Sequence, residues 1–556
     1  VLGLKEVGID DSFFEMGGDS IRSIQLVSRA RRAGLIISPG DVFRHPTAAA
    51  LASLARPLKD LSRTTISPTG LLTPTPIMAR LFHRADDFST FYQSIVVKVP
   101  PLLGLDILEK AFRTIVDHHD ILRLRVLKKT GDAHPELFVD KRGTDTGIFV
   151  TLLDMLHCQN NSFDTLLNDA MNLALSKINL EAGKVLHAVW LDAGPELAGR
   201  LLIVIHHLAV DGVSWRILLP DLEAACQAFT SNEKPALDPV GMSFREWAKI
   251  LEEEGQSNKR HSELTFWNNV TSAEDPLVSS RPFNPKVDTW ATRRRIVLKL
   301  PTEVTSPILT NVLSRFNARI NDVLLTAFAM AVRKWRNEIG YSDYEEVVID
   351  LEGHGREDIR PDIDLSRTVG WFTTQFPVIL RVDTTSAADV SIVNRNIKSI
   401  KEQLRSVPNN GIGYGLLCNL SPAHKNALTT KTIPQIGFNY LGRFDVGPDD
   451  TGFWHLSSEV AEHDLSKNRI PIEHPIEVDA VTIDEDGHPV LEAQWTWAGL
   501  LFDETAITKL AQYWFAALTD ISKLSQSHNL GGMTPSDSPL VSLTQSEIDD
   551  IESYFE

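Results

Sequence analysis

IHHLAVDGVSW, at residues 205–215, follows directly on the apolar run LLIVI at residues 201–205. The run predicts a buried strand, and two histidines stand where that strand emerges into a loop. Loops held on a rigid scaffold often carry catalytic groups. A helix-like stretch at residues 216–229 comes next, and strands and helices then alternate without a fixed repeat. This alternation indicates a layered α/β architecture.

The second half of the chain partly repeats this order. We expect a strand at residues 294–300, a helix at 321–335, and strands at 345–351 and 375–382. Near the end, the apolar stretches at 476–483 and 489–497 flank Asp486-Gly487, which is a good hairpin signal. The α/β pattern therefore extends over most of the chain.

Length and composition limit the possible classes of protein. The 556 residues exceed what one hydrophobic core usually supports, so two or more units are expected. The net charge of −18 disfavours nucleic acid as a partner. No apolar run approaches the roughly 20 residues of a membrane-spanning helix. The three cysteines, Cys158, Cys226 and Cys418, have no disulfide or zinc spacing, which favours the cytoplasm.

The first unit is predicted at residues 1–55, and a Ser, Thr and Pro mixture at 56–70 reads as a linker. The opening residues lack a secretory signal and read like the middle of a longer polypeptide. Within the unit, Gly17-Gly18-Asp19-Ser20 stands at the start of a helix, where free N–H groups favour a phosphate. Ser20 is therefore a candidate for carrying a phosphodiester. The alternative is that Asp19 or Ser20 only caps the helix.

Two titratable residues follow predicted strands of the larger unit. His207 is the candidate acid/base, because a histidine pKa near about 6.5 lets one ring nitrogen accept a proton at neutral pH. Glu352, in EGHGR at residues 352–356, is the second candidate. Taken alone, the histidines are equally well explained as inert buried groups, and Glu352 as a surface partner of Arg356. These alternatives stay open at the level of the single motifs.

The larger patterns carry a resemblance to known families. DDSFFEMGGDS at residues 10–20, the helix after it and VFRHPTAAALA at 42–52 resemble the peptidyl carrier, or thiolation, domain of nonribosomal peptide synthetases. The resemblance implies a small four-helix fold with most of its first helix missing here. It also implies 4′-phosphopantetheine on Ser20, with Asp19 typical of carriers that serve epimerization domains.

HHLAVDG resembles the HHxxxDG signature of the condensation-domain superfamily, which includes the epimerization domains. EGHGR, RTVGWFT at residues 367–373, PNNGIGYG at 408–415 and FNYLGR at 438–443 resemble the successive motifs of epimerization domains. The resemblance implies a two-lobed fold like that of chloramphenicol acetyltransferase over residues 71–530, with lobes at about 71–285 and about 286–530. Residues 531–556 resemble a linker to a downstream domain.

The resemblance also assigns roles to residues. His207 and Glu352 would be catalytic, and supporting roles would fall to His206, Asp211, Gly212, Asn439 and Tyr440. The implied reaction is epimerization of an aminoacyl or peptidyl thioester by removal and return of the α-proton. Because a thioester already acidifies the α-carbon and no metal-ligand spacing occurs in the sequence, we expect neither metal nor pyridoxal phosphate. Implied partners are an adenylation domain, a downstream condensation domain and a phosphopantetheinyl transferase. The alternatives are a condensation domain and a noncatalytic docking module.

Overall fold

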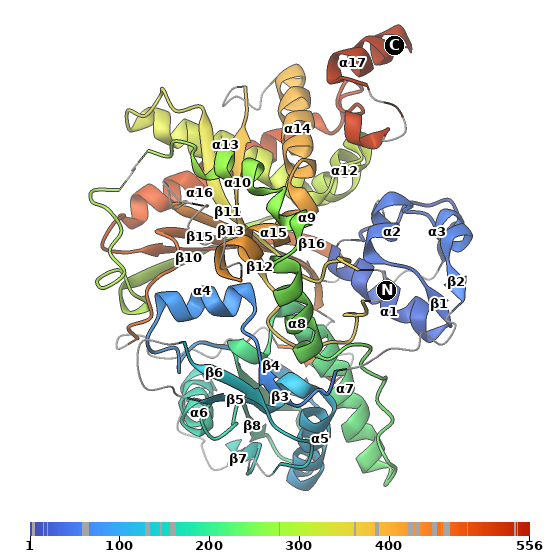
Figure 1. Ribbon diagram of the computed structural model, residues 1–556, viewed down its shortest axis with the longest axis vertical. Helices are drawn as coiled ribbons and strands as arrows, with labels where there is room; N and C mark the ends of the chain where they lie inside the picture. The colour runs from blue at the N-terminus through green and yellow to red at the C-terminus, as the bar shows by residue number, and fades with distance from the viewer. Residues whose placement is uncertain are drawn as a thin grey trace.

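The computed structural model describes residues 1–556 except 3–5, 15, 19, 58–65, 128–133, 145–146, 156–162, 277–278, 361–362, 384–388, 421–427, 429–433, 447–452, 458, 460–467, 486, 539–540, 542 and 556. A small helical unit lies beside two larger α/β lobes (Figure 1). The predicted α/β fold class is confirmed, and so are the predicted strands and helices of both lobes.

The N-terminal unit contains three described helices, α1 (Ser20–Arg32), α2 (Pro39–Arg44) and α3 (Ala48–Leu54). Strand β1 (Leu35–Ile36) pairs antiparallel with β2 (Arg56–Pro57), which closes the unit where the linker was predicted to begin. Its small core includes Phe13, Val27 and Val42. Gly34 follows α1 with φ of 80°, as expected of a glycine that stops a helix.

The first lobe is built on a five-stranded sheet in the order β14-β4-β9-β8-β7. Along β9 (Gly199–His206), Ile203 and Ile205 join one core, whereas Leu202 and Val204 join another on the opposite face. The run LLIVI is apolar throughout because both faces of its strand are covered. The other elements are β4 (Tyr92–Val99), β7 (Val150–Asp154), β8 (Leu186–Asp192), β3 (Gly70–Leu72), β5 (Leu124–Leu127), β6 (Glu136–Val139), α4 (Pro76–Arg84), α5 (Leu105–His118), α6 (Phe163–Lys177), α7 (Gly212–Thr230), α8 (Phe244–Gly255) and α9 (Asn258–His261). Helix α10 (Leu264–Thr271) follows these along the chain, but its Trp267 is buried in the core of the second lobe.

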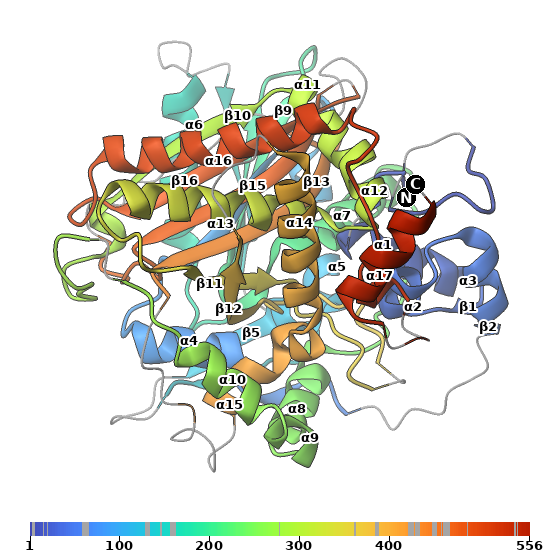
Figure 2. The same ribbon diagram turned by 90° about the horizontal axis from the view of Figure 1, so that it is seen from above.

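The second lobe is built on a six-stranded sheet in the order β10-β16-β15-β13-β11-β12. Helices α13 and α16 run side by side across it (Figure 2), and Trp514 of α16 packs in the core with Trp495 of β16. The elements are β10 (Arg293–Leu300), β11 (Glu346–Gly353), β12 (Thr374–Arg381), β13 (Ile436–Val446), β15 (Ile476–Glu485), β16 (His488–Ala498), α11 (Thr302–Pro307), α12 (Leu313–Phe316), α13 (Ile320–Glu338), α14 (Val390–Arg405), α15 (Ile412–Asn419), α16 (Glu504–Leu524) and α17 (Gln545–Phe555).

The two lobes exchange chain segments. Strand β14 (His455–Leu456) comes from the second half of the sequence but pairs with β4 in the first sheet. Val369, Trp371 and Phe372, which follow the EGHGR motif, are buried in the core of the first lobe. The lobes are therefore held together by packing as well as by the chain that connects them.

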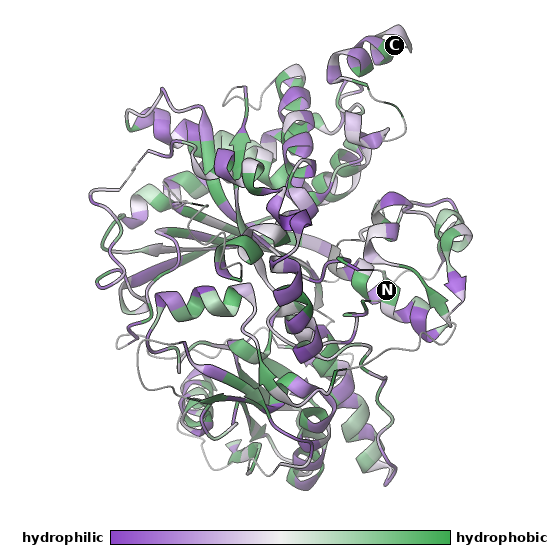
Figure 3. Ribbon diagram, viewed as in Figure 1, coloured by the Kyte–Doolittle hydropathy of each residue, from purple (hydrophilic) through white to green (hydrophobic). Residues whose placement is uncertain are grey.

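Hydropathy follows this layering. The strands inside both lobes are largely hydrophobic, and the outer helices mix hydrophilic with hydrophobic residues (Figure 3). Among the described helices, none combines the length and the apolar composition that crossing a bilayer requires.

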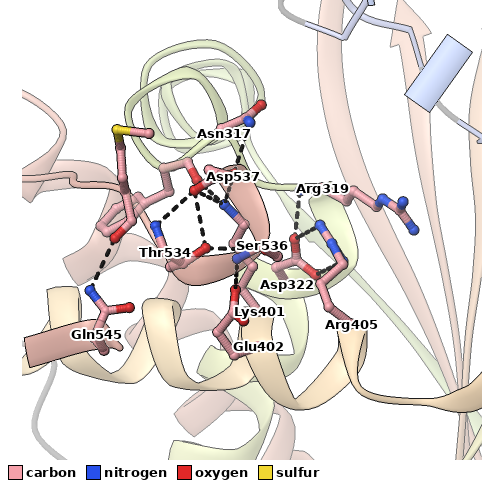
Figure 4. A network of polar contacts seen from close by, with 12 residues as sticks. Asn317, Arg319, Asp322, Lys401, Glu402, Arg405, Thr534, Ser536, Asp537 and Gln545 are labelled. Carbon is pink, nitrogen blue, oxygen red and sulfur yellow. Dashed lines mark hydrogen bonds and ion pairs between the residues drawn. The ribbon is translucent and has the colours of Figure 1, made fainter. Parts of the chain in front are cut away.

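The segment after α16 is tied to the second lobe by buried polar contacts (Figure 4). Lys401 of α14 donates to both carboxylate oxygens of Asp537 at 2.6 and 2.7 Å and to the carbonyl oxygen of Phe316 at 2.7 Å. One turn along α14, Arg405 binds Asp322 at 2.8 Å. The tail thus contacts the same helix that positions Asp322. The prediction that residues 531–556 lead to a downstream domain stays a prediction.

We expect Asp537→Asn to lower the free energy of unfolding of this lobe by about 3 kcal/mol, because it leaves the buried ammonium of Lys401 without its counter-charge. Urea-induced unfolding followed by tryptophan fluorescence measures the loss. The matched control is Asp520→Asn, whose partner Lys523 is exposed, and its cost should stay below about 1 kcal/mol. Equal small losses in both variants would contradict a stabilising role for the buried pair.

Candidate functional site

A cavity of about 770 Å³ is lined by residues of both lobes and by Phe14, Gly17 and Gly18 of the N-terminal unit. It brings together six of the residues that the sequence singled out, namely His207, Asp211, Gly212, Glu352, Asn439 and Tyr440. His206 does not line it. The cavity therefore joins motifs that lie more than 200 residues apart in the sequence.

The two adjacent histidines have different environments. His206 is fully buried at the end of β9, where its Nε2 donates to the carbonyl oxygen of Phe88 at 2.8 Å and its Nδ1 accepts from the Leu208 amide. Burial lowers its pKa to about 4. Both ring nitrogens are thus engaged with the main chain, which is a structural role. The sequence-based alternative of an inert histidine applies to His206.

His207 begins a short 3₁₀ turn, His207–Ala209, and faces the cavity. Its ring stacks on Phe91 with centroids 4.8 Å apart, and Trp371 packs beside it at 4.7 Å. Its Nε2 lies 3.0 Å from the side-chain nitrogen of Gln93. Burial lowers the pKa of His207, so the ring is neutral at pH 7 and able to accept a proton.

Asp211 links the two main motifs across the lobes. It caps α7 by accepting from the Ser214 amide at 2.7 Å, and it also accepts from the Phe372 amide at 3.2 Å. Arg356 of EGHGR forms a buried ion pair with it at 3.1 Å. The alternative pairing of Glu352 with Arg356 is thus replaced by an Arg356–Asp211 pair. Gly212 is the first residue of α7 and lines the cavity next to this cap.

Glu352 lies on β11 and faces the cavity from the second lobe. Burial raises its pKa to about 8, and the carboxylates of Asp479, Glu473 and Glu477 contribute to this rise by repulsion. At neutral pH this carboxyl is therefore largely protonated. The cavity thus holds a neutral imidazole on one side and a protonated carboxyl on the other, which is a base with an acid.

Asn439 and Tyr440 of β13 also line the cavity but are engaged with other side chains. The Asn439 amide donates to Asp479 at 3.4 Å, and the Tyr440 hydroxyl lies 2.8 Å from the Thr482 hydroxyl. Asn439 thus contacts Asp479, whose carboxylate repels that of Glu352 and whose own pKa burial raises to about 6. Their supporting role in an active-site tunnel stays a prediction.

Several polar residues of the cavity were not singled out from the sequence, among them Glu357, which directly follows EGHGR. Glu473 is held by Arg84 at 2.7 Å, and the Glu357 carboxyl accepts from Asn410 at 2.8 Å while burial raises its pKa to about 7. Asp479 was detectable, because the alternation in IEVDAVTI places it on the same strand face as Glu477. Glu473 and Glu357 lie in loops, which have no side-chain periodicity from which the direction of a side chain could be predicted.

The loop before α1 reaches the cavity through Gly17 and Gly18. Gly17 has φ of 90°, a backbone conformation that favours glycine, and a Cβ atom there would lie 2.7 Å from a guanidinium nitrogen of Arg443, which would have to shift. Arg443 is fixed in turn by Asp484 at 2.6 Å. Ser20 begins α1, as predicted, but its side chain and the whole of Asp19 lie outside the described residues.

Among the described residues, one group has ligand atoms close enough for a metal ion, namely His118, His119 and Asp221. It lies outside the cavity lining. Asp221 is already engaged by the guanidinium of Arg367 and by His119 at 2.9 Å, and His118 by the carbonyl of Asp238. A guanidinium on the carboxylate makes this group a structural ion-pair network rather than a metal centre.

Family models match both units of the chain. The model described as "Condensation domain" matches residues 79–530, and the "Phosphopantetheine attachment site" model matches residues 1–55. The chain is 36% identical over 564 residues to a linear gramicidin synthase protein of Brevibacillus parabrevis, and 31% identical over 561 residues to surfactin synthase subunit 1 of Bacillus subtilis (strain 168). These alignments cover 99% and 100% of this chain but 7% and 15% of those proteins.

Solved structures show the same fold. The epimerization domain from the third module of tyrocidine synthetase B matches with a TM-score of 0.73 and 27% identity, over 84% of this chain and 99% of that one. The condensation domain from the Monacolin K polyketide synthase matches with a TM-score of 0.61 and 16% identity, over 83% of this chain and 98% of that one.

We expect Asp479→Asn to lower the pKa of Glu352, because it removes the strongest carboxylate repulsion while the burial stays. Infrared difference spectra across a pH titration measure this through the protonated carboxyl band, assigned with Glu352→Gln. The control is Glu492→Gln, which also lines the cavity but pairs with Lys299 at 3.1 Å. A Glu352 midpoint that stays near 8 in Asp479→Asn would refute this cause.

Proposed function

Because this chain belongs to the condensation-domain family of nonribosomal peptide synthetases and has a phosphopantetheine attachment site in its first unit, we propose that it epimerizes an aminoacyl or peptidyl thioester. The thioester would be carried on 4′-phosphopantetheine attached to Ser20. The observation that carries the proposal is the single cavity lined by His207, Glu352 and the glycines next to Ser20. Residues 1–55 would be the carrier and residues 71–530 the epimerization domain, working in the cytoplasm.

The position of the first unit supports delivery of the thioester into the cavity. Arg31 at the end of α1 forms an ion pair with Asp364, and Arg32 pairs with Asp238. The Gly40 amide at the start of α2 donates to Asp358 at 3.3 Å. These contacts hold the unit with the loop before Ser20 at the cavity, so that an arm attached there enters between the lobes.

Epimerization needs a base, an acid and surroundings that stabilise the negative charge on the thioester oxygen of the enolate. In one direction, the neutral His207 removes the α-proton, and the electron pair of the C–H bond moves to the thioester carbonyl to form an enolate. The protonated Glu352 then returns a proton to the opposite face of the α-carbon. In the reverse direction the two groups exchange roles. At neutral pH each group begins in the form that the first direction requires. That direction leaves His207 protonated and Glu352 ionised, which are the forms that the reverse direction requires.

Three features favour epimerization over condensation. EGHGR and FNYLGR both contribute residues to the cavity. The match to an epimerization domain has a higher identity than the match to a condensation domain. A protonated carboxyl facing a neutral imidazole suits proton return, whereas condensation requires only assistance to an attacking amine. An adenylation domain, a downstream condensation domain and a phosphopantetheinyl transferase would be the partners.

The experiment loads Ser20 with an L-aminoacyl or L-peptidyl phosphopantetheine in deuterated water and follows α-deuterium and chirality after release. We expect deuterium uptake and an L/D mixture, slowed by about 10²- to 10⁴-fold in His207→Ala and in Glu352→Gln. Glu233→Gln, an exposed carboxyl after α7, is the control. Peptide-bond formation with an acceptor-loaded carrier, without exchange, would favour condensation. Carrier binding with neither reaction would favour a docking module.

The pH dependence follows from the two pKa shifts. The exchange of the α-proton for deuterium should be fastest at pH values between the pKa of His207, which is lowered below 6.5, and the pKa of Glu352, near 8. Below this window His207 is protonated and cannot act as base, and above it Glu352 loses the proton that it must donate. A rate that keeps rising above about pH 9 would contradict the assignment of Glu352.

Charge reversal tests the position of the carrier. Arg31→Glu should slow exchange about fivefold, the factor that corresponds to about 1 kcal/mol for a partly exposed ion pair. The double variant Arg31→Glu with Asp364→Arg should recover most of the rate. Arg44→Glu is the control, because Arg44 pairs within its own unit with Asp41. Failure of the double variant to recover would mean that this pair does not position the carrier.

A further inference from the structure

A chain of hydrogen bonds leads from α7 to His207 through a residue of β4. The indole Nε1 of Trp215 donates to the side-chain oxygen of Gln93 at 2.9 Å. The side-chain nitrogen of the same Gln93 lies 3.0 Å from Nε2 of His207. Gln93 lines the cavity beside His207. A single amide thus contacts an indole at one end and the candidate base at the other.

The direction of each bond follows from the groups involved. An indole N–H only donates, so the atom of Gln93 that faces Trp215 is its oxygen. The amide nitrogen then faces His207, and an amide NH₂ only donates. Nε2 of His207 must therefore accept, which leaves its lone pair at Nε2 and its proton on Nδ1. Trp215 decides the orientation of Gln93, and Gln93 decides the tautomer of His207.

We infer that Gln93 is a positioning residue which, oriented by Trp215, holds His207 in the tautomer with the lone pair on the Nε2 atom. This inference rests on the proposed function only in assigning His207 as the base. The ring plane is fixed independently by the stacking on Phe91. A thioester entering the cavity displaces the Gln93 amide from Nε2 of His207. The lone pair on Nε2 then points at the α-proton without a change of tautomer.

The neighbouring histidine supports the assignment by contrast. His206 donates from Nε2 to a carbonyl oxygen and accepts at Nδ1 from an amide, so it has the opposite tautomer. Two adjacent histidines of the same strand end thus differ in tautomer because their partners differ. The partner of His207 is a side chain on another strand that lines the cavity, whereas the partners of His206 are main-chain groups.

Gln93→Glu is the most informative variant. A carboxylate accepts only, so it keeps the bond from Trp215 but now requires a proton on Nε2 of His207. We expect ¹⁵N spectra of histidine-labelled protein to show His207 changing from the Nδ1–H to the Nε2–H tautomer, with the signal assigned by His207→Ala. The added charge also raises the pKa of His207, so the acid side of the exchange profile moves to higher pH. Gln256→Glu makes the same change on the surface and should alter neither the tautomer of His207 nor the pH profile of exchange.

Trp215→Phe tests the other end of the chain. Without the indole donor, Gln93 is free to turn its oxygen toward His207, so a mixture of both tautomers is expected. Single-turnover exchange from the loaded carrier should slow by about tenfold, the factor that corresponds to one hydrogen bond. Thermal melting followed by circular dichroism identifies a variant that fails to fold, in which case Gln93→Glu decides alone.

The inference is overturned if His207 keeps the same tautomer in wild type and Gln93→Glu, or if wild-type His207 carries its proton on Nε2. Both readouts are made on protein without substrate. They therefore remain valid even if the wild-type chain shows no exchange with any thioester, which would refute the proposed function instead.

Discussion

The buried ion pair between Arg356 and Asp211 holds the two halves of the site in register. Asp211 belongs to the histidine motif of the first lobe, and Arg356 belongs to the glutamate motif of the second. Arg356 also donates to the carbonyl oxygen of Leu365 at 3.2 Å, so it fixes the loop that leads to Trp371. A buried charge that loses its partner is strongly destabilising. The relative position of His207 and Glu352 is therefore set by an interaction that involves neither of them.

The cavity separates the protonation states of its two candidate groups by different means. His207 is kept neutral mainly by burial among aromatic rings. Glu352 is kept protonated by burial and by neighbouring carboxylates of β15 and the loop before it. Burial and charge repulsion both disfavour the charged form of a group. The uncharged form of an imidazole is a base, whereas the uncharged form of a carboxyl is an acid. The same cavity can thus hold a base and an acid without a direct bond between them.

The first unit and the tail contact the larger unit at places that border the cavity. Gly17 approaches Arg443, which is anchored by Asp484 on β15. The tail binds Lys401, on the helix whose Arg405 holds Asp322 in the cavity lining. The first unit thus contacts a residue of the cavity wall, and the tail contacts the helix that carries another.

Local patterns were enough to predict the elements, the motifs and the two candidate groups. A continuous apolar run predicted β9, helical periodicity predicted α13, and the Gly-Gly-Asp-Ser pattern predicted the start of α1, because these signals lie within short stretches of chain. Which groups meet is a property of the folded chain. Gln93, Asp479 and Arg443 approach His207, Glu352 and Gly17 from distant parts of the sequence. Their pairing arises from strand order and lobe packing, which no local pattern encodes, and so do the tautomer and the pKa values that those contacts impose.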